Sequence, residues 1–185
     1  RYAEAMEALA LPGERQPAHD ALARALAGEP AEQAWHWEAA MRFGLARDAH
    51  VLAGEAAAEV EPAGTAFFHD QRALELLDVH DAHPGALALA GSAEDELVLR
   101  TADAAFADDN PRRAADLVQQ LIDQRSSVTQ LSEAARRGEA ARRDLQRQLG
   151  MLHLRMGQYQ AASGDLGSAI AACESAVQLV PREPA

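Results

Sequence analysis

Small residues recur at fixed positions in the last stretch of the chain, residues 149–184, and they limit how it can fold. Within the segment LGMLHLRMGQYQAASGDLGSAIAACESAVQLVPREP, these small residues and the closing proline fall at Gly157, Gly164, Ala169, Ala176 and Pro181. Two antiparallel helices approach closely only where small side chains meet, and glycine permits the sharp turn expected at Gly164. Proline stops a helix because it lacks the backbone donor. The stretch therefore predicts a closely packed helical hairpin, although an arbitrary alanine-rich hairpin is the alternative.

The same spacing occurs in two earlier stretches of the chain. In each set, a small residue of a first helix is followed 12 and then 7 positions later by residues of a second helix. The three sets are Gly54, Ala66 and Ala73; Ala102, Ala114 and Leu121; and Gly157, Ala169 and Ala176. The sets lie 48 and 55 residues apart, further than the period of about 34 residues in tetratricopeptide (TPR) repeats. We therefore predict an all-α fold, an irregular TPR-like α-solenoid in which helical hairpins form a right-handed superhelix.

Proline and glycine positions suggest how the chain is organised. Residues 1–44 are interpreted as an N-terminal helical segment that ends a preceding region, and residues 45–185 as repeats at about 47–80, 95–128 and 150–183. Gly44 is expected to end the helix that carries Trp35 and Trp37, both interpreted as packing anchors. A long helix is expected from about residue 130 to residue 157, unless Gly138 interrupts it.

Composition excludes several classes of function. Aromatic residues make up 4% of the 185 residues, which disfavours a β-sandwich or a barrel. All 17 basic residues are arginine, so a Walker A lysine and a Schiff-base lysine are absent from this sequence. The net charge of −12 argues against direct contact with nucleic acid. The single Cys173 cannot form a disulfide within the chain, and no apolar run is long enough for a membrane span.

Five short segments carry a resemblance to a known family. They are Trp35–Ala40 (WHWEAA), Ala73–Leu77 (ALELL), Leu99–Ala105 (LRTADAA), Asn110–Ala114 (NPRRA) and Leu179–Pro184 (LVPREP). Together they resemble the helical region of large LuxR-type, ATP-binding transcriptional regulators of the signal-transduction ATPase class, similar to maltose-activator-type proteins. The resemblance implies a P-loop ATPase before this region and a DNA-binding domain after it. The chain departs from the pattern at Asp70 and Cys173, which occupy a position in the second helix that is usually aromatic.

Arginines on the expected long helix are the best candidates for ligand or partner contact. Arg136, Arg143 and Arg147 are spaced by seven and four residues, and such a stripe could hold an acidic segment or a phosphorylated ligand. The alternative is a solvated face that is neutralised by nearby acidic residues such as Glu139 and Asp144.

A second polar cluster raises the question of a metal site. It contains His69, Asp70, Asp78, His80, Asp81 and His83. Residues 69 and 80 would share one helix face, but no recognised ligand spacing is complete, and a polar helix end that runs into a loop explains the cluster equally well. We expect no metal and no cofactor, and we name no catalytic residue.

The sequence as a whole favours a non-catalytic role. We predict a cytoplasmic TPR-like sensor or protein-interaction arm of a larger ATP-dependent transcriptional regulator. Its partner would be another protein or the regulator's own ATPase and DNA-binding domains, with self-association as a further option and no nucleic-acid or membrane contact. The first alternative is a domain that binds a small-molecule effector in a groove around Arg143 and Arg147. The second is a metal-dependent enzyme built on His69, His80 and His83.

Overall fold

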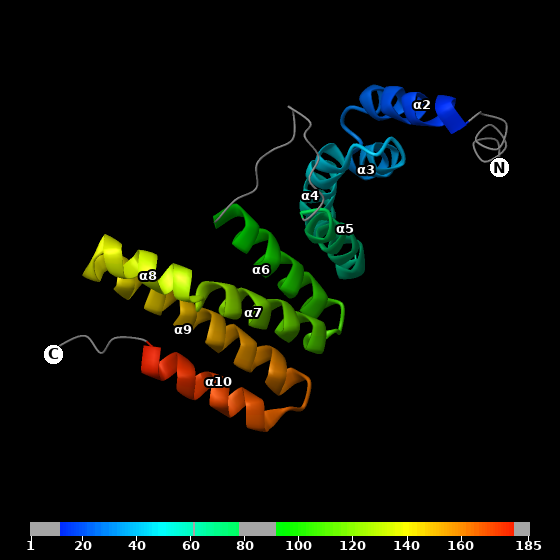
Figure 1. Ribbon diagram of the computed structural model, residues 1–185. Helices are drawn as coiled ribbons and strands as arrows, with labels where there is room; N and C mark the ends of the chain where they lie inside the picture. The colour runs from blue at the N-terminus through cyan, green and yellow to red at the C-terminus, as the bar shows by residue number, and fades with distance from the viewer. Residues whose placement is uncertain (1–11, 61, 78–91, 180–185) are drawn as a thin grey trace. The chain divides into compact units, whose positions relative to one another are not determined.

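The chain folds into helices alone over the part that the structure describes. The computed structural model describes residues 12–60, 62–77 and 92–179 (Figure 1). Every regular element in these ranges is an α-helix, and helices that are neighbours in sequence pack against each other from α2 to α5 and from α7 to α10. The fold is therefore all-α and solenoid-like, as the spacing of small residues predicted. Within the same ranges, no helix is both long and apolar enough to cross a membrane.

Backbone contacts divide the chain into two compact units, Arg1–Leu97 and Val98–Ala185. The first unit contains α2 (Pro12–Ala25), α3 (Pro30–Ala39), α4 (Phe43–Val60) and α5 (Ala63–Glu75). In this unit α2 packs on α3, α3 on α4 and α4 on α5. A buried core consists of Ala23, Ala34, Trp37, Ala46, Ala49 and Leu76. Because four of these six side chains are alanine, the helices can pack closely around the single large ring of Trp37.

The expectation that Gly44 ends a helix is wrong. α3 already ends at Ala39, and Met41 adopts a left-handed conformation with φ 57°. The backbone N–H of Arg42 donates to the carbonyl of Trp37 at 2.8 Å, which is the hydrogen bond that closes a helix around a left-handed residue. Gly44 instead lies buried in the first turn of α4. A domain boundary between residues 44 and 45 stays a prediction, whereas the contacts divide the chain after Leu97.

The second unit is built from α6 (Ser92–Ala107), whose first turn precedes the division, and from four further helices. These are α7 (Pro111–Arg125), α8 (Val128–Arg137), α9 (Glu139–Ala162) and α10 (Leu166–Leu179). α9 packs against α7, α8 and α10. The turns after α6 and α9 use the same closing geometry as Met41, with left-handed residues at Asp109 (φ 59°) and Gly164 (φ 87°). The two hairpins therefore share one type of connection.

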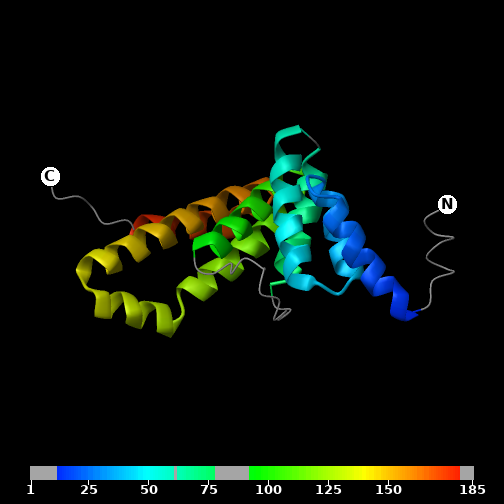
Figure 2. The ribbon, with the colours of Figure 1, turned by 90° about the horizontal axis from the view of Figure 1, so that it is seen from above.

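Gly138 interrupts the long helix that the sequence suggested. Its φ of 102° suits glycine and ends α8, and α9 begins at the next residue (Figure 2). α9 then continues to Ala162, so Gly157 lies inside this helix and not at its end.

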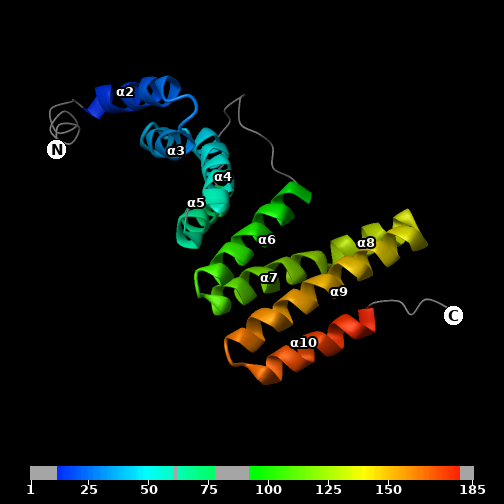
Figure 3. The same cartoon turned by 180° about the vertical axis from the view of Figure 1, so that it is seen from behind.

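The residues that define the repeats occupy the helix interfaces. Gly54, Ala66, Ala73, Ala102, Ala114, Gly157, Ala169 and Ala176 are all buried, and Gly164 forms the turn between α9 and α10 (Figure 3). Pro181 lies outside the described residues. A Cβ atom added at Gly54 would lie 2.1 Å from Oδ1 of Asp70, and one added at Gly157 would lie 3.0 Å from Sγ of Cys173. The close approach of α4 and α5 therefore requires glycine at position 54, and α9 and α10 leave little room beside Gly157.

Candidate functional site: an apolar groove on the last hairpin

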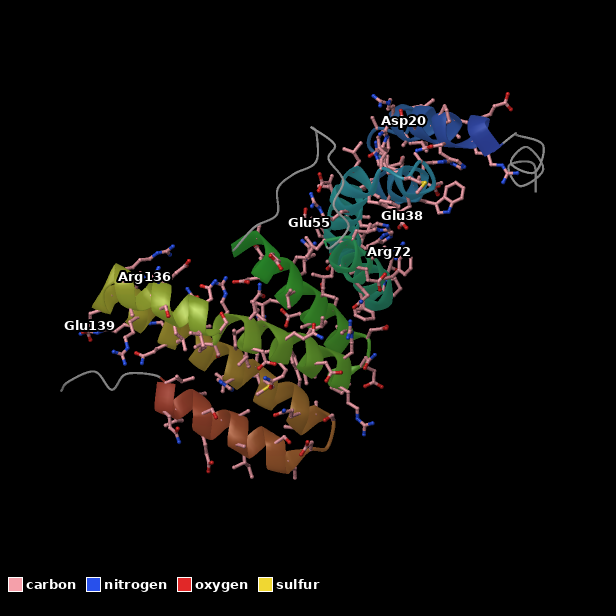
Figure 4. All side chains as sticks on the ribbon, viewed as in Figure 1. Asp20, Glu38, Glu55, Arg72, Arg136 and Glu139 are labelled. Carbon is pink, nitrogen blue, oxygen red and sulfur yellow. The ribbon has the colours of Figure 1, made fainter. Side chains whose placement is uncertain are left out.

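The three arginines proposed for ligand contact do not share one helix. Arg136 lies on α8 (Figure 4), before the break at Gly138, whereas Arg143 and Arg147 lie on α9. Arg143 pairs with Glu139 at 3.3 Å and Arg147 with Asp144 at 3.5 Å, and all four side chains are exposed. These are the local pairs of a solvated helix face. A role in ligand binding stays a prediction for the three residues.

A hollow of about 160 Å³ does lie beside these arginines, but other residues form it. It is lined by Arg125, Gln130, Glu133, Ala134, Arg137, Ala141, Asp144, Leu145 and Gln148. Arg137 is neutralised there by Glu133 at 3.7 Å. This hollow is therefore not the closed groove that was expected around Arg143 and Arg147, because neither arginine lines it.

The candidate metal cluster can be described only in part. Asp78, His80, Asp81 and His83 lie outside the described residues. His69 and Asp70 are buried on α5, and Nδ1 of His69 lies 2.9 Å from Nδ1 of His50. Among the residues that the structure describes, no group of three or more potential ligands could hold a metal ion.

A polar network connects α3, α4 and α5 in the first unit. Nε2 of His50 lies 2.8 Å from Oε1 of Glu38, and the guanidinium of Arg72 donates to both carboxylate oxygens of Glu38 (Figure 4). Arg72 also pairs with Glu75 at 2.7 Å. The hydrogen bond from Arg72 is the main cause that lowers the pKa of Glu38, and burial lowers the pKa of His50 although Glu38 opposes this. At neutral pH the network therefore contains an ionised Glu38 and a neutral His50.

Neutral His50 fixes the direction of the contact with His69. If its Nε2–H donates to Glu38, its Nδ1 must accept from Nδ1–H of His69. Both ring nitrogens of His50 are then engaged inside the protein, and its side chain is only 4% exposed. A general base must reach the proton that it removes from a substrate. The network is therefore suited to holding three helices together and not to catalysis.

A second pair of histidines occurs at the corresponding place on α2 and α3. Nδ1 of His19 lies 2.9 Å from Nδ1 of His36, with the edge of Trp35 against the ring of His19. In the α4–α5 hairpin, Phe68 holds the same edge-on position against His50. The first unit thus contains two hairpins with the same paired histidines and the same flanking aromatic ring.

Sequence reasoning missed this duplication, although a signal was present. Trp35-His36 follows Glu-Pro-Ala at residues 29–31, and Phe68-His69 follows Glu-Pro-Ala at residues 61–63. The first histidines are 31 residues apart and the second histidines 33 apart, close to the TPR period of about 34 residues. α2 and α3 therefore form a repeat-like hairpin, and Trp35, which is 52% exposed, flanks its histidines.

An apolar hollow lies in the second unit, between α9 and α10, and we call it the α9–α10 groove. Its volume is about 860 Å³, and it is lined by Gly157, Gln158, Ala161, Leu166, Ala169, Ile170, Cys173, Glu174, Val177 and Gln178. Leu166, Ile170 and Val177 are 64%, 60% and 73% exposed. Glu174 is the only charged residue in this lining. Apolar surface gathered in a groove is typical of a docking site.

The equivalent positions of the preceding hairpin show what such a groove accepts. Cys173 and Val177 correspond to Val118 and Ile122 on α7, 55 residues earlier, and these two side chains are buried. In that hairpin α9 packs against α7, and Tyr159 of α9 contacts Phe106 of α6, with ring centroids 5.1 Å apart. The hydroxyl of Tyr159 also donates to Asp103. Contact with α9 therefore accompanies burial of Val118 and Ile122 on the α6–α7 hairpin, while Phe106 stays 42% exposed.

No protein-family model matches this chain, and no curated protein matches it.

Proposed function

We propose that this chain is a non-catalytic helical-repeat interaction module and that the α9–α10 groove is its contact surface. One observation carries the proposal: the positions that α9 helps to cover on the preceding hairpin are exposed and apolar on the last one. Each hairpin of a solenoid buries its apolar face against a neighbour, so an uncovered face favours docking of another helix.

The chemistry of the occupant follows from α9 itself. The side of α9 that packs inside the second unit carries Leu145, Leu149, Leu152, Met156 and Tyr159, all buried, at alternating spacings of four and three residues. An amphipathic helix with this pattern fits a groove between two helices. The groove has Ala161 where the covered hairpin has Phe106, and Gln158 where it has Asp103. The best-fitting occupant would therefore place a larger apolar side chain opposite Ala161 than α9 places opposite Phe106, and an uncharged polar group opposite Gln158.

A peptide-binding measurement tests the proposed function. The probe is a fluorescently labelled peptide of residues 139–162, which carries the α9 pattern, titrated with the whole chain. We expect saturable binding that Val177→Glu abolishes and that Ala171→Glu, an exposed change on another side of α10, leaves intact. A peptide in which Leu145, Leu149 and Leu152 are replaced by Gln is the matched control. Equal binding to the wild type and to Val177→Glu, or no binding to a monomeric chain, would overturn the proposal.

For the wider context, we propose that the module is the sensor or interaction arm of a larger LuxR-type, ATP-dependent transcriptional regulator. This rests on the five short sequence segments and on the solenoid-like fold with which they agree. In such a protein, occupancy of the groove would favour one curvature of the repeats and thereby bias the ATPase. A full-length sequence with a P-loop upstream and a helix-turn-helix downstream would support this context, and a different set of flanking domains would overturn it.

A further inference from the structure

The helix that docks in the α9–α10 groove can be assigned from the exposed surface of the same chain. α10 presents Leu166, Ile170, Cys173 and Val177 in one line, at spacings of four, three and four residues. This is the spacing at which side chains of one helix pack into the gaps of another. We propose that the occupant is α10 of a second copy of this chain, which forms an antiparallel, two-fold symmetric dimer. The inference rests on the proposed function and names the partner.

The side chains of this line complement themselves when two copies run antiparallel. A two-fold axis midway between Ile170 and Cys173 places Ile170 of one copy opposite Cys173 of the other, and Leu166 opposite Val177. Each layer then combines a larger side chain with a smaller one, which fills space better than layers of equal residues. In a symmetric contact the same surface serves both copies, so every layer occurs twice.

Charge permits this contact although the chain as a whole is acidic. The net charge is −12, but residues 101–185 carry 10 Arg against 11 acidic residues. α10 itself has one charged residue, Glu174, among Leu166–Leu179. Two copies that meet through α10 therefore bring together a surface with a single charged residue in each copy, so charge repulsion across the contact is small.

Charge also complements at the ends of the contact. α9 and α10 run antiparallel (Figure 3). Arg147 belongs to the first half of α9, which therefore lies toward the C-terminal end of α10. In the antiparallel dimer, that end faces the start of α10 in the other copy, which carries Asp165. The present partner of Arg147 is Asp144 at 3.5 Å, and both side chains are more than half exposed. Such a pair contributes little, so Arg147 can turn toward the acid of the second copy.

Sedimentation equilibrium of the whole chain tests the dimer. We expect a mass twice the 19.8 kDa of the chain in the micromolar range. Ile170→Glu and Val177→Glu should each raise the dimer dissociation constant at least about 100-fold, because a charge would be buried in an apolar contact. Circular dichroism should show unchanged helix content, and Ala171→Glu should leave the dimer intact. A wild-type chain that stays monomeric, or a dimer that persists in Ile170→Glu, would overturn the proposal.

Cross-linking tests the antiparallel arrangement. With copper–phenanthroline as oxidant, Ile170→Cys should form a disulfide with the native Cys173 of the second copy. We expect its cross-linked dimer to form at least about tenfold faster than that of the wild type, in which the two Cys173 thiols lie on different layers. Ala171→Cys is the matched control, with no acceleration. Wild-type cross-linking as fast as that of Ile170→Cys would indicate parallel helices and would overturn the arrangement.

The outcomes separate this inference from the proposed function. A monomeric chain that still binds the peptide of residues 139–162 through the groove would overturn the second copy as occupant and leave the docking function standing. A monomeric chain that binds no peptide would overturn both.

Discussion

The two units use the same helical hairpins but connect them by different chemistry. In the first unit, buried or half-buried polar groups link the helices, as the pair of His50 with His69 and the contacts of Glu38 with Arg72 show. In the second unit, the buried side chains of α7, α9 and α10 are mainly apolar, and Asp103 bonds to Tyr159 and Arg155. A polar contact needs one specific partner, whereas an apolar face accepts any helix of matching shape. The first unit is therefore suited to a fixed structure and the second to docking.

One pair of equivalent positions shows the difference directly. In the α4–α5 and α9–α10 hairpins, a side chain of the second helix lies against a glycine of the first: Asp70 against Gly54, and Cys173 against Gly157. Asp70 is fully buried, while Cys173 is exposed. The first unit thus uses this position to bury an acid, and the second presents it to solvent inside the groove.

The largest expected effect comes from filling the space beside these two glycines. Gly54→Ala should lower the free energy of unfolding by about 2–3 kcal/mol, because the new Cβ meets a buried carboxylate that cannot move away. Gly157→Ala should cost less, about 1 kcal/mol, because the exposed Cys173 can turn aside and alanine favours the helix, although the backbone oxygen of Ala169, 3.2 Å from the new Cβ, must shift slightly. Urea unfolding followed by circular dichroism measures both.

Gly167→Ala on α10 is the matched control for both changes. The nearest neighbouring atom to a Cβ added at Gly167 is Oδ1 of Asp165, at 3.8 Å, so the new methyl group fits without strain. The helix preference of alanine should therefore stabilise this variant by up to about 1 kcal/mol. Equal losses in Gly54→Ala and Gly157→Ala would show that the two units do not differ at this position.

Loss of the carboxylate that joins three helices should have the next largest effect. Glu38→Gln removes the charge that Arg72 and His50 contact and should cost about 1–2 kcal/mol, less than in a fully buried pair because Arg72 is 37% exposed. Both tryptophans lie on α3, so their fluorescence during urea unfolding reports on the first unit. Glu139→Gln, which removes an exposed pair in the second unit, should change stability by less than about 0.5 kcal/mol. Similar losses of stability in Glu38→Gln and Glu139→Gln would contradict the prediction that Glu38 holds α3, α4 and α5 together.

Acid should weaken each unit through one histidine. Burial lowers the pKa of His50 in the first unit and of His153 in the second. The unfolded chain, with a histidine pKa of about 6.5, then binds more protons than the folded one, so the free energy of unfolding falls as the pH drops through about 6.5. The fall should level off below the folded-state pKa, and a further loss follows below about pH 4.5 as Glu38 gains a proton.

His153→Leu separates the two contributions. It should remove the acid sensitivity between about pH 7 and pH 5 from the unfolding of the second unit, measured by amide exchange of α9, and leave the tryptophan signal of the first unit unchanged. Persistent acid sensitivity of α9 in this variant would show that another group is responsible.

The smallest effect is expected for the exposed arginines of α9. Arg143→Ala and Arg147→Ala should each change the free energy of unfolding by less than about 0.5 kcal/mol, because their pairs lie in solvent. A thermal-shift series with sugars and nucleotides checks the alternative of an effector site. A ligand that raises Tm in the wild type and fails in both variants would establish that alternative and weaken the contrast between the units.

The sequence predicted the fold better than the site, for physical reasons. Small residues such as Gly54 and Gly157 must lie at close helix contacts, so their spacing alone revealed the hairpins. The end of α3 was misplaced because Met41, a residue that rarely adopts a left-handed conformation, closes the helix. The paired histidines were missed because a contact between two helices depends on their relative rotation. The groove was missed because the exposure of Val177 depends on whether another helix packs on α10. The spacing of apolar residues within α10 does not carry that information.

Amide hydrogen exchange of the whole chain, with and without the peptide of residues 139–162, would locate the docking surface most directly. The chain should become protected in α10 and in the second half of α9, while α4 and α5 exchange as before, because the groove lies between α9 and α10. Protection that appears in α4 and α5, or nowhere in the chain, would contradict the proposal that the α9–α10 groove is the interaction surface.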